Sequence, residues 1–398
     1  MSKRGLPILI ALLIIGMVLK EPFLITLASA LFVIVGVAWW WQKRSLVGVT
    51  YRRSFHFIRG FPDEKIDLQV EVENRKLLPI TWLRVQDGWD KAIGPVDEEI
   101  LAPSHIKDRG ILTNIFSLRW YEKAQRSYTL LLRKRGIYSA GPARLDTGDL
   151  FGIFENNKEV GPSQYLTVFP TLLPFSNFKF PAEDPFGDRR SRRRLFEDPN
   201  RPMGVREYRP EDSFRRVHWP ATARTGQLQV KVYQPTTGQV MMVCLNVSTF
   251  TRHWEGVYPE LLEYLIKVAA TLIDEGISEG YKVGLVANGC LAHADQPFRI
   301  PPGRSPQQLA VLLQALAGVT SVVTGKFERF LLREIPRVPY GATLIILTAV
   351  TSPELATALI QLKQHERRIT LFSLAEEPPP IIPGIQTIHQ PFKGIESV

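Results

Sequence analysis

The chain has 398 residues, of which 45% are hydrophobic and 22% are charged. These values are typical of folded globular proteins and exclude a disordered or fibrous chain, and the length exceeds what one ordinary domain needs. The two cysteines, Cys244 and Cys290, are too few for a disulfide framework and form no C-x-x-C pair, which excludes a structural zinc site. The excess of 49 basic over 39 acidic residues indicates an anionic surface nearby.

Residues 6–41 form an apolar stretch in which only Lys20 and Glu21 are charged. A helix on the surface of a soluble protein needs a polar face, so this stretch predicts a membrane segment. The charged pair divides it into two predicted helices, 6–19 and 22–41. At about 1.5 Å per residue the second helix is roughly 30 Å long, which matches a bilayer core, whereas the first is nearer 21 Å and requires local thinning or snorkelling flanks. We therefore predict a transmembrane hairpin within residues 1–45.

The charges around this segment predict its orientation. The turn between the two helices is neutral, whereas basic residues flank both outer ends: Lys3, Arg4, Lys43, Arg44, Arg52 and Arg53. The positive-inside rule then places both ends, and the remainder of the chain, in the cytoplasm. Two alternatives stay open. One is a single anchoring helix, and the other is a signal peptide cleaved after Ala30, although the apolar stretch continues beyond that residue.

Residues 46–170 have the pattern of a β domain. Residues 66–74 alternate strictly between apolar and polar side chains, as a strand with one solvated face does. Further β-like segments at 80–85, 127–132 and 165–169 are separated by clusters of Gly, Pro and Asp. Short strands at this spacing predict a β-sandwich-like domain. No nucleophile and base are grouped in it, so we interpret it as a spacer or docking domain.

The C-terminal region, residues 236–398, alternates between strands and helices. This alternation, with strands that are apolar throughout, predicts an α/β domain with a parallel, doubly wound sheet. The predicted strands are 240–245, 282–287, 343–347 and 368–374, and the predicted helices are 258–273, 306–316 and 353–365.

Residues 171–235 connect the two domains and are rich in arginine: eleven arginines and five acidic residues lie between 189 and 224. The first five arginines predict an exposed basic loop: Arg189, Arg190, Arg192, Arg193 and Arg194. We expect this loop to contact lipid head groups or an acidic protein, and no nucleic-acid partner is expected because the chain contains no recognisable nucleic-acid-binding module. The later arginines alternate with acids and aromatics. They predict a paired, partly buried network of Arg206, Asp212, Arg215 and Arg224, with Tyr208 and Trp219 packed among them, that joins the β domain to the α/β domain.

The later part of this segment resembles a known family signature. The signature runs from Gly204 to Arg224 and continues into Leu228–Val230; its distinctive residues are Arg206, Tyr208, Arg209, Asp212, Arg215, Arg216, His218, Trp219 and Arg224. It resembles that of the "domain of unknown function 58" family, and residues 149–154 resemble a second recurring segment of that family. Glu211 and Pro220 depart from its pattern. The resemblance implies a C-terminal von Willebrand factor A-like domain and no established reaction. It also implies a partnership with MoxR-type AAA+ ATPases in membrane-associated systems.

The resemblance also implies where a metal ion would bind. Von Willebrand factor A domains often hold a divalent cation through Asp-x-Ser-x-Ser after the first strand, with a Thr and an Asp elsewhere. Here the corresponding residues are Asn246, Ser248 and Phe250, and Thr348 after the third predicted strand is followed by alanine. Hard cations need several oxygen ligands and usually carboxylate charge. We therefore expect a degenerate site without metal or other cofactor, and a face that binds protein.

Other chemical signals are weaker. Gly325-Lys326 lacks the spacing and the hydroxyl residue of a phosphate-binding loop, and Cys290 with His293 lacks an orienting third group. His218 could be catalytic, but a polar packing role is the simpler interpretation. We expect a membrane-anchored cytoplasmic scaffold, not an enzyme, that works with a MoxR-type AAA+ ATPase in the assembly or maturation of a membrane-associated complex. The alternative is a hydrolase-type enzyme with a site near the arginine signature. The oligomeric state is left open.

Overall fold

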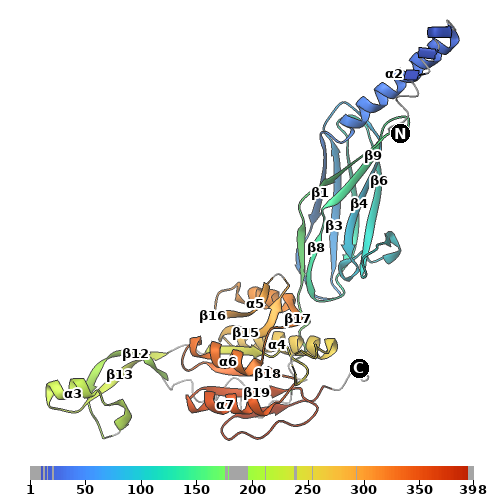
Figure 1. Cartoon of the computed structure of the whole chain (residues 1–398). Helices are drawn as coiled ribbons and strands as arrows, with labels where there is room; N and C mark the ends of the chain where they lie inside the picture. The colour runs from blue at the N-terminus through green and yellow to red at the C-terminus, as the bar shows by residue number, and fades with distance from the viewer. Residues whose placement is uncertain are drawn as a thin grey trace. The chain divides into compact units, whose positions relative to one another are not determined.

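The computed structural model describes residues 10–11, 14–15, 17–19, 22–174, 178, 196–210, 212–236, 240–252, 254–292 and 294–392. The chain divides into two compact units, residues 1–169 and 170–398 (Figure 1). The first unit contains an apolar helix and several β-sheets, and the second contains the helices and strands of a mixed sheet.

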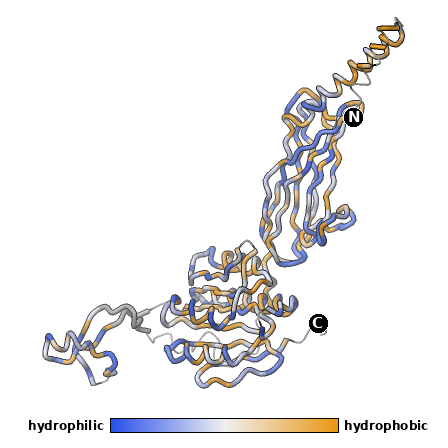
Figure 2. Tube along the Cα trace, viewed as in Figure 1, coloured by the Kyte–Doolittle hydropathy of each residue, from blue (hydrophilic) through white to orange (hydrophobic). Residues whose placement is uncertain are grey.

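Helix α2 (Pro22–Ser45) is long and apolar enough to cross a membrane, and Figure 2 shows its hydrophobic residues along most of its length. It extends beyond the predicted end at residue 41. Of the predicted first helix, 6–19, the described residues 10–11, 14–15 and 17–19 are helical. The other residues of 6–19 and the predicted turn at Lys20 and Glu21 lie outside the described residues. Among the described residues, the structure therefore contains one helix of membrane-spanning length.

The C-terminus of α2 is bonded to the β-sheets of the same unit. Lys76 donates hydrogen bonds from Nζ to the carbonyl oxygens of Arg44 and Val47, each at 2.8 Å, and to that of Ser45. An ammonium group here satisfies carbonyls that have no partner inside the helix, and it complements the negative end of the helix dipole. A second contact lies beside it, because Asn156 Nδ2 donates to the carbonyl oxygen of Gln42 at 2.9 Å.

Three mostly antiparallel sheets of the first unit surround one hydrophobic core. Their strand orders are β1-β3-β7, β10-β9-β4-β6-β5 and β2-β11-β8. The predicted strand at 66–74 is confirmed as β3, whose residues alternate between buried and exposed positions along its whole length. The elements are β1 (Val49–Phe55), β2 (Arg59–Gly60), β3 (Lys65–Asn74), β4 (Ile80–Asp90), η1 (Lys91–Ile93), η2 (Glu98–Ile100), β5 (Leu101–Pro103), β6 (Arg109–Leu118), β7 (Lys123–Leu131), β8 (Gly136–Ala140), β9 (Ala143–Gly148), β10 (Glu155–Val160) and β11 (Gln164–Val168). The shared core includes the fully buried Trp89 and the apolar faces of β3 and β4.

The second unit contains a seven-stranded sheet in the order β16-β15-β14-β18-β19-β20, with β17 also paired to β15. Strands β15, β14, β18, β19 and β20 are parallel. The strands are β14 (Val240–Leu245), β15 (Lys282–Leu291), β16 (Ala294–Gly303), β17 (Val319–Val323), β18 (Thr343–Thr348), β19 (Arg368–Ser373) and β20 (Gln386–His389). The four predicted strands are parallel, as expected, but the sheet as a whole is mixed, because two strands that were not predicted, β16 and β17, run antiparallel to β15. Strand β16 starts directly after β15, and a connection that short cannot cross over to a parallel position.

The helices of this unit cover the sheet because their apolar sides pack on it. Helix α4 (Pro259–Ser278) is buried along most of its length, which explains why its sequence is apolar almost all round. The others are α5 (Gln308–Gly318), α6 (Phe327–Glu334), η6 (Ile335–Arg337) and α7 (Pro353–Gln364). Helix α7 begins at a capped turn, in which Ser352 Oγ accepts a hydrogen bond from the backbone N of Leu355 at 3.1 Å.

Residues 196–236 form a separate hairpin that we call the signature arm. Strands β12 (Phe196–Glu207) and β13 (Gln229–Thr236) pair antiparallel in a two-stranded sheet of their own. Between them lie η5 (Phe214–Arg216) and the short helix α3 (Trp219–Thr225). Val217 and Val230 face each other across an isolated bridge, and both are buried. The arm therefore holds its own fold around a small apolar contact.

Candidate functional site

The carboxyl edge of the parallel strands gathers several polar residues. Asn246 and Ser248 follow the end of β14, and Thr348 ends the neighbouring strand β18. The chain passes from β14 to its neighbour β15 and later returns to the other side of β14 as β18, and such a reversal of strand order is where ligands bind in open α/β sheets. Asn288, near the end of β15, joins this group, although the sequence analysis did not single it out. This edge is therefore a candidate site.

The polar residues at this edge are bonded to one another in a closed, neutral network. Asn246 Nδ2 donates to Thr348 Oγ1 at 3.0 Å, and its Oδ1 accepts from Ser248 N and from Asn288 Nδ2, each at 3.1 Å. Asn288 Oδ1 accepts in turn from Val247 N at 2.7 Å. All four side chains in the network are buried. The amide oxygens that could ligate a cation are thus already used, and no carboxylate supplies the charge that a hard cation prefers.

The remaining residue of the predicted metal pattern, Phe250, is exposed and does not belong to this network. Within the described parts of the chain, no group of three or more His, Cys, Asp or Glu side chains is placed to hold a metal ion. The network therefore has a structural role: its hydrogen bonds hold the segment after β14 to the ends of both neighbouring strands.

In the signature arm, Arg206 and Asp212 form a bidentate ion pair. Arg206 NH1 and NH2 donate to the two carboxylate oxygens of Asp212 at 2.6 Å each, and Arg209 N donates to Asp212 Oδ2 at 2.9 Å. These hydrogen bonds lower the pKa of Asp212, and those from Arg206 have the largest effect. The Arg206 side chain is 42% exposed and the Asp212 side chain is 10% exposed, so the pair is partly buried. Among the described residues no ion pair links it to Arg215 or Arg224.

The predicted network is therefore wrong in two respects. The ion pair between Arg206 and Asp212 lies within the arm, and Trp219 is 64% exposed, not packed among the arginines. A two-stranded hairpin has too little interior to bury so many large side chains, and of its aromatics Tyr208 packs on Phe214 with ring centroids 5.3 Å apart. Phe214 itself is 67% exposed. The arm presents these aromatics among exposed arginines, Arg209, Arg215, Arg216 and Arg224.

His218 has a structural role at the start of α3. It is the N-cap residue, and its Nδ1 accepts a hydrogen bond from the backbone N of Ala221 at 3.0 Å. This leaves the side chain engaged in capping. Neither cysteine is an evident nucleophile, because both are buried and burial raises the pKa of the Cys244 thiol. The possible partner of Cys290, His293, lies outside the described residues, as does the whole predicted basic loop, Arg189, Arg190, Arg192, Arg193 and Arg194.

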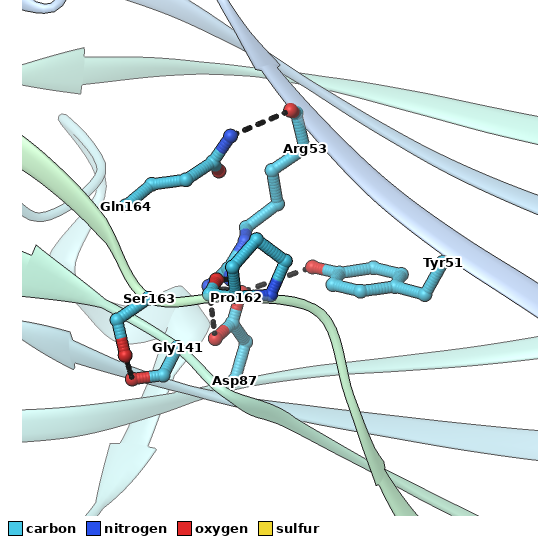
Figure 3. Close-up of polar contacts among 7 residues, drawn as sticks. All are labelled: Tyr51, Arg53, Asp87, Gly141, Pro162, Ser163 and Gln164. Carbon is cyan, nitrogen blue, oxygen red and sulfur yellow. Dashed lines mark hydrogen bonds and ion pairs between the residues drawn. The ribbon is translucent and has the colours of Figure 1, made fainter.

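The β unit contains a buried polar cluster that the sequence analysis missed (Figure 3). Arg53 NH1 donates to both carboxylate oxygens of Asp87 at 3.0 and 3.1 Å, and Tyr51 Oη donates to Asp87 Oδ2 at 2.9 Å. Arg53 NH2 donates to the carbonyl oxygen of Pro162 at 2.8 Å. Burial raises the pKa of Asp87, and the charge of Arg53 opposes this effect. Arg53 is one of the basic residues that we counted as flanking the apolar segment, but its guanidinium is buried and paired with Asp87.

Strand periodicity was the available signal for this cluster. In β1 the side chains of Val49, Tyr51 and Arg53 lie on the buried face, at every second residue. An arginine on the apolar face of a strand predicts a buried partner, although not which acid supplies it.

Comparison with known proteins gives a family match for the second unit. Residues 204–371 match the family described as "Protein of unknown function DUF58". The match begins in the signature arm and ends within β19. A Bacillus subtilis (strain 168) protein described as "Uncharacterized protein YeaD" is 20% identical over 227 residues, which cover 57% of this chain and 52% of that protein. The chain thus spans about half the length of this curated relative.

Similarities to solved structures are remote. The CARDB domain of a Pyrococcus furiosus protein is 12% identical and matches 30% of this chain and 91% of its own, with a TM-score of 0.21. A cohesin module from a Clostridium perfringens glycoside hydrolase is 7% identical and matches 30% of this chain and 96% of its own, with a TM-score of 0.22. At such TM-scores these similarities carry no argument about fold or function.

Proposed function

We propose that this protein is a membrane-anchored scaffold whose second unit is a von Willebrand factor A-like head that binds protein partners. The strand order supports the fold assignment: β14 and β15 are adjacent, β16 is an antiparallel edge strand beyond them, and β18, β19 and β20 follow on the other side. The closed amide network after β14 supports a head that acts by contact and not by metal chemistry. Helix α2 supports membrane attachment.

The observation that carries the binding role is the exposed surface of the signature arm. Aromatic and arginine side chains contribute most to the energy of protein interfaces, because they bury a large area and make several directed contacts. Phe214 and Trp219 are about two-thirds exposed, and arginines surround them. The hydrolase alternative has no comparable observation behind it, since His218 caps a helix and Cys244 is buried.

The partner that we propose is a MoxR-type AAA+ ATPase, and the process is the assembly or maturation of a membrane-associated complex. This part rests on the family resemblance of residues 204–224. We also propose that residues 6–19 form a second membrane helix, so that both soluble parts lie in the cytoplasm; the flanking basic residues support this orientation.

Site-specific photo-crosslinking in native membranes tests the partner. A photoreactive phenylalanine analogue at Phe214 or Trp219 should crosslink the full-length protein to an AAA+ ATPase of the same organism. The same analogue at Trp120 of the β unit, which is equally exposed, is the matched control and should not. The double variant Phe214→Ala/Trp219→Ala should lose co-purification of the ATPase. Equal crosslinking from Trp120, or retention of the ATPase by the double variant, would refute the assignment of the arm.

A further inference from the structure

Two adjoining cavities in the second unit are lined by an excess of cations. The larger, about 460 Å³, is lined by residues before and along α6 and by Asn288 and Pro297; its charged residues are Lys326, Arg329 and Arg333. The second, about 420 Å³, shares Pro297, Phe330 and Arg333 with it. Among the lining residues that the structure describes, none has a carboxylate, and the three charged ones are cations.

Among the described residues that line the second cavity, one is acidic, and its carboxylate is already paired with arginines. Glu334 is buried, and three arginines lie around its carboxylate: Arg333 at 3.1 Å, Arg337 at 3.2 Å and Arg299 at 3.6 Å. One carboxylate compensates one of these three charges, so about two remain in excess. In the larger cavity, Lys326 lies 4.0 Å from Glu354, but both side chains are exposed and such a pair contributes little. Arg329 forms no ion pair with any residue that the structure describes.

The larger cavity lies at the carboxyl edge of the sheet. Asn288 lines the larger cavity and is bonded to Asn246 and Ser248 in the closed network. The segment after the network returns to the same edge, because Tyr258 N donates to Thr249 Oγ1 at 2.6 Å. This segment carries three exposed aromatic side chains: Phe250, Trp254 and Tyr258. The edge thus combines a cationic cavity with exposed aromatics.

We propose that this edge binds an acidic segment of a partner protein, with an Asp or Glu carboxylate of that segment held in the cavity by Lys326, Arg329 and Arg333. Cations that lie within one cavity suit a single carboxylate, whereas a nucleic acid needs cations spaced along a groove that follows its backbone. The exposed aromatics of the segment that follows β14 supply the apolar part of a protein interface. The proposal rests on the proposed function in one respect only, that the second unit binds protein.

The test measures peptide binding by the full chain in non-ionic detergent micelles. The probe is fluorescein-labelled hexaglutamate, with hexaglutamine as the uncharged control. We expect the chain to bind hexaglutamate and not hexaglutamine, with an affinity that falls as salt is raised. The variant Lys326→Gln/Arg329→Gln should weaken binding by about tenfold or more. Both side chains are exposed, so the fold should be retained.

A matched control removes two cations from the opposite edge of the sheet. Lys282 starts β15 and Arg304 follows β16, and both are exposed. Lys282→Gln/Arg304→Gln should bind hexaglutamate as the wild type does. The reversed variant Lys326→Glu/Arg329→Glu should bind hexalysine instead. Equal losses in the two glutamine variants, no binding of hexaglutamate by the wild type, or stronger binding of a thymidine 20-mer at the same variant-sensitive site would each overturn the proposal. Failure of the arm to crosslink an ATPase would leave this measurement unaffected.

Discussion

At the scale of single residues, the Arg53–Asp87 pair shows how one buried charge determines its surroundings. The Arg53 side chain is 2% exposed, and its guanidinium contacts the Asp87 carboxylate, the carbonyl oxygen of Pro162 and the backbone of Gly141. Gly141 has φ of +93°, and a Cβ there would collide with the Arg53 guanidinium. Glycine is therefore required twice at this position, for its backbone conformation and for the close approach of the arginine.

Asp87→Ala should destabilise the β unit by about 3–5 kcal/mol, because it leaves the Arg53 charge buried without its partner. Asp67→Ala is the matched control. Asp67 lies in β3, which pairs with β1; its side chain is exposed, and the expected loss of stability is below about 1 kcal/mol. Hydrogen exchange of β1 and β4 amides, followed by mass spectrometry, reports the free energy of local opening. Similar protection in the two variants would show that the pair is energetically unimportant.

At the scale of elements, the joint between α2 and the β-sheets rests on few contacts. Lys76 holds three carbonyls at the end of the helix, and Asn156 holds a fourth. A cation at a partly buried helix C-terminus contributes about 1–2 kcal/mol. We therefore expect α2 and the sheets to move as one body.

Lys76→Met keeps most of the side-chain length but removes the charge and the donors, and it should loosen this joint. Spin labels on cysteines introduced at Val37 in α2 and Lys158 in β10 report the joint as a distance distribution. The two native cysteines are buried, which limits their labelling. The distribution should broaden in Lys76→Met.

Lys65→Met, at an exposed position of β3, is the control for this experiment and should leave the distribution unchanged. An equally narrow distribution in Lys76→Met would show that the other contacts suffice to fix the helix.

The signature arm should lose stability in acid. The folded-state pKa of Asp212 is lowered, chiefly by Arg206, so the pair contributes fully above the ordinary aspartate pKa of about 3.9. That contribution is lost as the pH falls through the lowered value. The protection factor of the Arg209 amide, which donates to Asp212, should decrease over that range. In Asp212→Asn this decrease should be absent, and an unchanged pH profile would contradict the assignment.

At the scale of the whole molecule, the proposed topology makes a labelling prediction. A cysteine introduced at Lys20, in the predicted turn, should react with a membrane-impermeant maleimide in intact cells. A cysteine at Lys158 should react only after the membrane is permeabilised. The reverse pattern would place the β-sheets outside the cytoplasm, and a mature chain beginning at Leu31 would establish the signal-peptide alternative.

Local sequence periodicity predicted the elements whose environment is uniform along their length. The alternation in β3 and the continuous apolar strands β14 and β18 report burial residue by residue, whereas the apolar run of α2 predicts a helix that is mostly exposed and long enough to cross a membrane. The arginine signature was recognisable because its residues are close together in the chain.

The tertiary structure alone decided which distant residues meet. Arg53 meets Asp87, Lys76 meets the end of α2, and Asn288 meets Asn246, because strand register and packing bring them together. The alternation of Val49, Tyr51 and Arg53 indicates that the arginine is buried, but it does not indicate which acid is its partner. The sequence did not indicate the exposure of Trp219 either. Whether an aromatic side chain is buried depends on how much interior its element shares with other elements, and a two-stranded arm has very little.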